Sequence, residues 1–213
     1  VDTSALGPSS VLRSTFANNT AELYGGGMMS ACMEMDIANC RFLNNEASIW
    51  GGAILVLYAG DFTLVNSVAA GNSDSGQGAV SIHAAGGAII NSAIVDNATG
   101  GVFLSTFDGE SLAVDNTIVW GNDGDAVTSK SGGELFVRAS NVEGGWKGPG
   151  NIDLPPGITV DPDGTITMDG DSPCIDAGND GLLPDDLLDL DADGDVAALL
   201  AVDTLSAGGA LNA

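Results

Sequence analysis

The strongest constraint on the fold is a sequence period of about 25 residues. Each copy is anchored by an Asn, and the five anchors are Asn19, Asn45, Asn72, Asn97 and Asn122. A fixed period in this range is typical of solenoids, in which each repeat buries its hydrophobic face against its neighbours. The period therefore predicts a stack of similar coils.

Aligning the copies on the anchor gives columns of similar side chains. The column eight residues before the anchor is aliphatic: Val11, Ile37, Leu64, Ile89 and Val114. The column three residues before it is apolar: Phe16, Phe42, Ala69, Ile94 and Val119. The column five residues before it is small: Ser14, Cys40, Ser67, Ser92 and Thr117. A Gly-rich step follows the anchor: Gly27, Gly52, Gly78 and Gly101, with Asp125 in the fifth copy. A third apolar column comes two residues later: Met29, Ile54, Val80, Phe103 and Val127.

These columns predict an all-β fold. A strand-plus-helix repeat is disfavoured, because Gly and Asn interrupt every candidate helix. We expect a right-handed parallel β-helix with three short strands per coil and about six coils. The sixth copy has Val137, Ser140 and Val142 in the columns before the anchor, and Gly145 replaces the Asn. We predict that residues 1–145 form the repeats and that residues 146–213 form a capping segment, which closes the end of the stack, and an acidic tail.

The recurring Asn is interpreted as structural. Asn tolerates left-handed backbone angles at corners, and stacked Asn side chains bond each other from coil to coil. Gly permits a sharp corner where a Cβ would clash. The five anchoring residues are therefore expected to form a ladder.

The charge of the chain excludes one class of partner. Lys and Arg number 5 against 29 Asp and Glu, so the net charge is −24. Phosphate backbones and anionic lipids repel such a polyanion, so we expect no nucleic-acid binding. Such a surface suits a salty or divalent-rich exterior, or it only keeps the protein soluble.

No apolar run is long enough to span a bilayer. The start lacks Met and a signal-like segment, which predicts a processed protein or a fragment.

Two features suggest additional bonds. Cysteines number 3, and Cys32–Cys40 is the local candidate for a disulfide. The sequence DLDADGD, with Asp189, Asp191, Asp193 and Asp195, resembles the first half of a calcium loop. Leu200 stands where an EF-hand needs its bidentate acid, so the alternatives are a looser calcium site and a solvated acidic loop.

No catalytic residues are predicted. Asp96 and Asp115 fall in different columns, so they do not form the carboxylate pair of a glycosidase. Arg13 and Arg41, which a lyase could use as a base, also differ in column. His83, the single histidine, has no nucleophile motif nearby and is expected to be a solvent-facing strand residue. We therefore expect a non-enzyme, with a polysaccharide lyase or glycosidase as the alternative.

The copies FANN…GGGMM and FLNN…GGAIL resemble the repeats of polymorphic outer-membrane proteins and related secreted bacterial β-helix proteins. The stretch from Gly150 to Asp180, with SPCIDAG (Ser172 to Gly178) at its centre, resembles the choice-of-anchor segment that closes many bacterial surface proteins. The resemblance covers about residues 11–195. The final 18 residues, VAALLAVDTLSAGGALNA, depart from the family's terminal motif.

The resemblance implies a secreted or cell-surface location and no defined reaction. We expect a structural protein that associates with copies of itself or with other surface proteins, end to end into a filament or surface layer. Polysaccharide binding or cleavage, and adhesion, are the alternatives. Calcium is the one cofactor that the sequence suggests.

Overall fold

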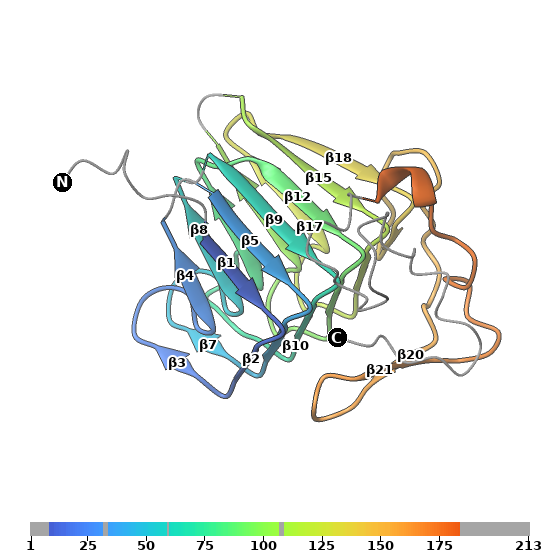
Figure 1. Cartoon of the computed structure of the whole chain (residues 1–213), viewed down its shortest axis with the longest axis horizontal. Coiled ribbons are helices and arrows are strands. Elements are labelled where there is room, and N and C mark those ends of the chain that lie inside the picture. The colour runs from blue at the N-terminus through green and yellow to red at the C-terminus, as the bar shows by residue number, and fades with distance from the viewer. Residues whose placement is uncertain (1–8, 32–33, 59, 107–108, 184–213) are drawn as a thin grey trace.

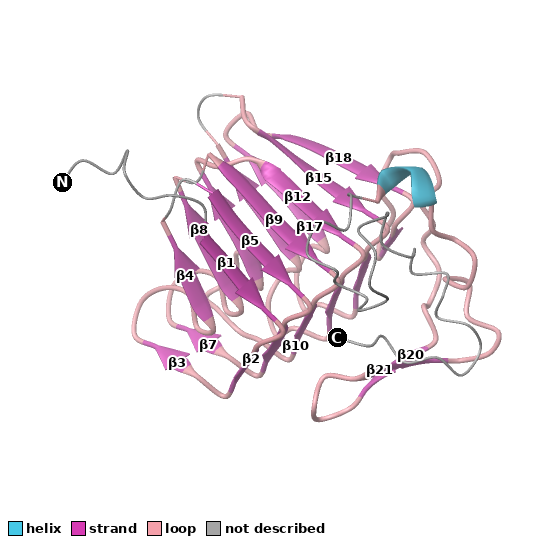
Figure 2. Ribbon diagram, viewed as in Figure 1, coloured by secondary structure: helices cyan, strands magenta, loops and turns pink. Residues whose placement is uncertain are grey.

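The described part of the chain is an all-β parallel β-solenoid of about five turns with almost no helix. The computed structural model describes residues 9–31, 34–58, 60–106 and 109–183. Figure 1 shows the strands stacked side by side from blue to yellow, with the orange segment outside the stack. Within the described ranges the one helix is a short 3₁₀ turn, Asp180–Leu182, drawn in cyan in Figure 2.

Three parallel sheets run the length of the stack. Sheet 1 contains β1 (Ser9–Leu12), β5 (Glu34–Ala38), β9 (Asp61–Val65), β12 (Gly87–Ile90), β15 (Ser111–Asp115) and β18 (Glu134–Arg138). Sheet 2 contains β2 (Thr15–Ala17), β6 (Arg41–Leu43), β10 (Val68–Ala70), β13 (Ala93–Val95), β16 (Ile118–Trp120) and β19 (Asn141–Val142). Sheet 3 contains β4 (Met28–Ser30), β8 (Ile54–Leu57), β11 (Val80–His83), β14 (Val102–Ser105) and β17 (Val127–Lys130). The sixth copy thus contributes to sheets 1 and 2, but no described strand extends sheet 3 beyond β17.

Two smaller pairings complete the described strands. β3 (Thr20–Ala21) pairs in parallel with β7 (Glu46–Ala47). β20 (Ile158–Val160) and β21 (Ile166–Met168) form an antiparallel hairpin.

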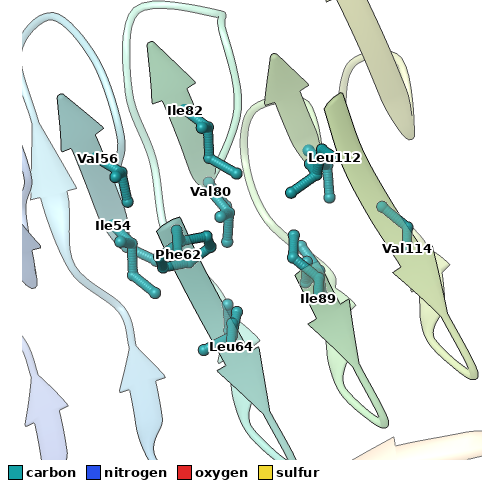
Figure 3. Close-up of a cluster of buried hydrophobic side chains, with 14 of the residues drawn as sticks. Ile54, Val56, Phe62, Leu64, Val80, Ile82, Ile89, Leu112 and Val114 are labelled. Carbon is teal, nitrogen blue, oxygen red and sulfur yellow. The ribbon is translucent and has the colours of Figure 1, made fainter. Parts of the chain in front are cut away.

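The strand register confirms both apolar columns before the anchor. Residues of the first column lie directly beside each other in sheet 1, from Val11 to Val114. Those of the second column do the same in sheet 2, from Phe16 to Val119. Their side chains fill the interior, and Figure 3 shows Leu64, Ile89 and Val114 in this core.

The predicted third column is wrong in two of its five copies. Met28 and Val102, not Met29 and Phe103, align with Ile54 in sheet 3. Met29 and Phe103 lie one residue further along and point to the outer face, where Met29 is 49% exposed. Inter-coil hydrogen bonds likewise show that the Gly-rich step consists of Gly26, Gly52, Gly78 and Gly100, followed by Asp125. Adjacent glycines in the first and fourth copies are compatible with either alignment, so spacing alone does not fix the register there.

The left-handed corners also differ from the prediction. The anchoring asparagines do not have positive φ; the residue before the anchor does in each of the five copies. These residues are Asn18 (φ 57°), Asn44 (φ 52°), Gly71 (φ 68°), Asp96 (φ 53°) and Gly121 (φ 69°). A second left-handed row joins sheets 1 and 2: Arg13, Asn39, Asn66, Asn91, Asn116 and Ala139. Left-handed angles are least costly for Gly, Asn and Asp, which explains most of the residues in both rows.

The chain beyond the repeats has two parts. Residues 146–152, the cap segment, cover the last coil: Ala139 N bonds Pro149 O, and Ile152 N bonds Ser140 O. Residues 153–183, the outer strap, run along the outside of sheet 2, where Ile166, Met168 and Cys174 pack on its outward apolar side chains. Among the described residues after the repeats, the cap segment lies over the last coil, whereas the outer strap lies along sheet 2.

Candidate functional site

The five anchoring asparagines lie in one column at the corner after sheet 2. In the first four, the side-chain Nδ2 donates to the Oδ1 of the Asn in the next coil, at 2.8–3.0 Å. The backbone N–H of the same four donates to the same Oδ1, at 2.9–3.2 Å. From Asn45 onward, Nδ2 also donates to a backbone carbonyl of the preceding coil, such as Phe16 O for Asn45. These bonds satisfy buried amides, so this Asn ladder is a structural element.

The column of small residues five before the anchor forms a second series of hydrogen bonds, a role that its small size did not predict. A backbone N–H in each coil donates to the side-chain oxygen of the next coil, starting from Cys40 N. The acceptors are Ser67 Oγ (3.0 Å), Ser92 Oγ (3.2 Å), Thr117 Oγ1 (3.4 Å), Ser140 Oγ (3.1 Å) and Asn151 Oδ1 (3.1 Å). The signal was present, because all but one of the small residues in this column carry a hydroxyl. We call this the hydroxyl column.

The N-terminal end of the stack is open as far as the described residues go. It consists of β1, β2 and β4, and among the described strands none pairs with their outer edges. The inward side chains at this end are Val11, Phe16 and Met28, which pack on the core but are only partly buried. Asn19 is exposed, whereas Asn45 is 1% exposed. Unpaired strand edges over apolar side chains form a template for another β-structure.

The C-terminal end is different, because the cap segment lies on it. Trp146 packs against the core, and Asn151 continues the hydroxyl column. Asn151 Nδ2 also donates to Val137 O at 2.8 Å, which occupies part of the β18 edge. The two ends of the solenoid are therefore chemically unlike.

A row of rings lies on the outer face of sheet 3. Tyr24, Trp50, His83 and Phe103 follow one another at centroid distances of 4.8–5.4 Å, and Lys130 Nζ lies 5.5 Å from the Phe103 ring. The His83 side chain points outward as predicted but is half-buried between two rings rather than free in solvent. Its Nε2 lies 3.0 Å from Gln77 Oε1. Burial lowers the pKa of His83, so the neutral imidazole is favoured.

The acidic and basic residues considered for catalysis are not brought together. Asp115 is buried in a bidentate ion pair with Arg138. Asp96 lies at a corner, where burial and the nearby Glu143 raise the pKa of its carboxyl. In the described part of the chain, no group of three His, Cys, Asp or Glu residues is arranged to hold a metal ion.

The remaining candidate residues fall partly outside the described ranges. Asp189, Asp191, Asp193 and Asp195, the candidate calcium ligands, lie outside them, as does Cys32. Cys40 is buried in the hydroxyl column and Cys174 is buried in the outer strap, and neither forms a disulfide with a described residue. The Cys32–Cys40 disulfide and the calcium site stay predictions.

The SPCIDAG motif fastens the outer strap to the solenoid. Ser172 Oγ donates to Pro156 O, and Asn141 Nδ2 donates to Cys174 Sγ at 3.1 Å. Asn116 and Asn179 exchange two hydrogen bonds a few residues later. The motif is therefore a packing element in this structure.

The fold and its ladders define the class of protein as a parallel β-solenoid. Comparison with known proteins finds no matching family, no matching curated protein and no matching solved structure. No helix in the described residues is long and apolar enough to cross a membrane.

Proposed function

We propose that this chain is a non-catalytic structural protein of the cell surface or extracellular space that associates through one end of its solenoid. The observation that carries the proposal is the open N-terminal end, with unpaired edges of β1, β2 and β4 over partly buried Val11, Phe16 and Met28. A filament or surface layer would also need a contact at the other end, which the cap segment partly covers. The N-terminal end is therefore the main association surface.

Other features support the proposed extracellular location and a right-handed coil of three strands. A right-handed coil with three strands agrees with the crossover rule for parallel strands. A net charge of −24 suits a salty exterior, where calcium bound by the Asp-rich tail would also be available. The repeats and the SPCIDAG segment resemble those of secreted bacterial surface proteins.

Sedimentation velocity across a wide range of protein concentration tests this function. We expect a concentration-dependent increase in mass, or capture of a surface protein, and loss of the association in Met28→Lys. Met29→Lys is the matched control, because Met29 lies on the outer face of sheet 3 next to Met28. A wild-type chain that stays monomeric and binds no surface protein would contradict the proposal.

A second function, polysaccharide binding, is favoured by one observation, the row of rings on sheet 3. Phe103 is buried, but the partly exposed Tyr24 and Trp50 and the exposed Lys130 offer apolar and polar contacts to an extended sugar chain. A glycan array without binding, or binding that Trp50→Ala leaves unchanged, would exclude it. A reducing-sugar assay separates binding from cleavage.

A further inference from the structure

The N-terminal end carries two unfinished columns of hydrogen bonds. Inside the stack, Asn72 Oδ1 accepts from Asn45 N and Nδ2, and Asn72 Nδ2 donates to Asn97 Oδ1 and Phe42 O. Asn19 makes only the bonds that face the next coil, to Asn45. No described group donates to Asn19 Oδ1, and its second amide hydrogen has no described acceptor. Both therefore face the open end.

The hydroxyl column ends in the same unfinished way. Ser14 Oγ donates to Leu12 O at 2.8 Å. Ser67 Oγ makes the equivalent bond to Val65 O and in addition accepts from Cys40 N of the preceding coil. For Ser14 no described N–H fills that role. The end thus offers a second acceptor, on the far side of Phe16 from Asn19.

Between these polar groups lies an apolar surface shaped for a further coil. The Phe16 ring stacks on Phe42 with centroids 5.0 Å apart and planes 4° apart, and this contact covers one face of the Phe16 ring. Phe42 and Ile37, one coil further in, are fully buried, whereas Phe16 and Val11 are not. A flat ring is best covered by another apolar layer at the spacing of stacked strands.

We propose that the N-terminal end docks a further β-solenoid coil. That coil binds through its C-terminal face and carries an Asn in register with the Asn ladder. Such a coil supplies what the end lacks. The N–H and Nδ2 of its Asn donate to Asn19 Oδ1, and its carbonyl accepts from Asn19 Nδ2. Another backbone N–H of the coil donates to Ser14 Oγ. An apolar patch alone would accept many partners. Asn19 and Ser14 restrict the partner to a coil whose hydrogen-bonding groups are in register with theirs.

A second copy of this chain fits less well. Its C-terminal face carries Gly145 in the ladder position and is covered by the cap segment. If the N-terminal ends of two copies met face to face, each Ser14 Oγ would face the hydrogen-bond acceptors of the other copy rather than backbone N–H donors. The occupant is therefore a coil from a β-solenoid partner. This inference rests on the proposed function, since it names the kind of partner that the association surface accepts.

The test attaches such a coil covalently. Residues 62–86, a whole coil containing Asn72, are copied and inserted between residues 8 and 9 of the full chain. Register dictates the junction, because Ser9 aligns with Met35, Met35 with Phe62 and Phe62 with Gly87. Stability is measured by urea unfolding, and the protection of the copied Asn72 amide is measured by hydrogen exchange. A copy with Asn72→Ala removes the ladder bond, and a copy with Ser73→Ala is the control.

We expect the unmodified and Ser73→Ala copies to raise the urea midpoint and to protect the copied Asn72 amide. The Asn72→Ala copy should lower the folded-to-unfolded ratio about two- to fivefold relative to the unmodified copy, because it loses the Nδ2 bond to Asn19 Oδ1 and keeps the backbone N–H bond. A copied coil that adds no stability, or an Asn72→Ala copy as stable as the Ser73→Ala copy, would overturn the inference. A monomeric wild type would instead count against self-association, because the attached coil docks within one chain.

Discussion

At the scale of the residue, the solenoid depends on buried amides that are fully satisfied. Asn45, Asn72 and Asn97 are at most 1% exposed and bond to the coils on both sides. A buried polar group without a partner costs more than an ordinary hydrogen bond contributes. The ladder therefore penalises any coil whose Asn is out of register.

Replacing an interior ladder residue should be costly, whereas replacing the terminal one should not. Asn72→Ala removes the acceptor of the N–H and Nδ2 of Asn45 and the bond to the carbonyl of Phe42, and we expect a loss of about 2–4 kcal/mol of unfolding free energy. Asn19→Ala, exposed and bonded on one side, should cost less than about 1 kcal/mol. Urea denaturation of both variants checks this. Equal losses of unfolding free energy in the two variants would show that bonding to the coils on both sides does not make an interior ladder Asn more important than the terminal one.

Stability should fall in mildly acidic solution because of His83. Burial lowers its pKa in the folded chain below 6.5, so the unfolded chain takes up a proton at higher pH than the folded chain does. This contribution is therefore complete above about pH 6.5 and is lost as pH falls through the lower folded pKa. Urea midpoints between pH 7.5 and pH 5 should fall further for the wild type than for His83→Gln. Parallel curves would rule out this role.

At the scale of the element, short strands are held in register by close approach of neighbouring coils. The Gly-rich step supplies that approach, because there the backbone of one coil presses on the next. A Cβ on Gly52 would lie 2.5 Å from the carbonyl oxygen of Ser73. The glycine is thus required by the neighbouring coil rather than by its own backbone angles.

Gly52→Ala should separate two coils and destabilise the protein by about 1–3 kcal/mol, the usual cost of overpacking. Gly170→Ala is the matched control, because a Cβ at Gly170 meets no atom within 4 Å. Thermal unfolding measured by circular dichroism compares the two. If Gly52→Ala has the same melting temperature as the wild type, the coils can move apart at little cost in free energy.

The sequence predicted the parts of this fold that repeat. The columns of Ile37 and Phe42 follow from spacing alone, because stacking places the same position of every coil in one environment. It failed where spacing was ambiguous, at Met29 and Phe103. It could not show that the strap leaves the end and covers sheet 2, because Ile166 finds its contacts far away in sequence. End-to-end association was expected, but the Asn19 atoms that have no partner among the described residues are visible only in the structure.

At the scale of the whole molecule, two unlike ends and one strapped side limit how the protein meets its surroundings. The strap buries Leu43, Val68 and Val95 on the outside of sheet 2, which would otherwise be an exposed apolar strip. The C-terminal end carries its own cap. Apolar contact with another molecule is thereby directed to the N-terminal end and to the ring row of sheet 3.

The charge of the molecule should make its stability depend on salt. With −24 net charge, like charges repel in the folded state, and added salt screens them, since the Debye length falls from about 30 Å at 0.01 M to about 8 Å at 0.15 M. We expect the melting temperature to rise with NaCl. An unchanged or falling melting temperature would show that repulsion between surface charges does not limit stability.

Calcium is tested on the same background by comparing CaCl₂ with MgCl₂ at equal ionic strength. Screening alone predicts equal melting temperatures in the two salts. A calcium site in the Asp-rich tail predicts a higher melting temperature in CaCl₂, because Ca²⁺ accepts a larger number of oxygen ligands than Mg²⁺ and tolerates less regular geometry. Replacing Asp191 and Asp193 by Asn should abolish only the calcium-specific part and leave the response to NaCl intact. If the two divalent salts act alike in the wild type, the tail is a solvated acidic segment, and the charge of the chain serves solubility in a salty exterior rather than metal binding.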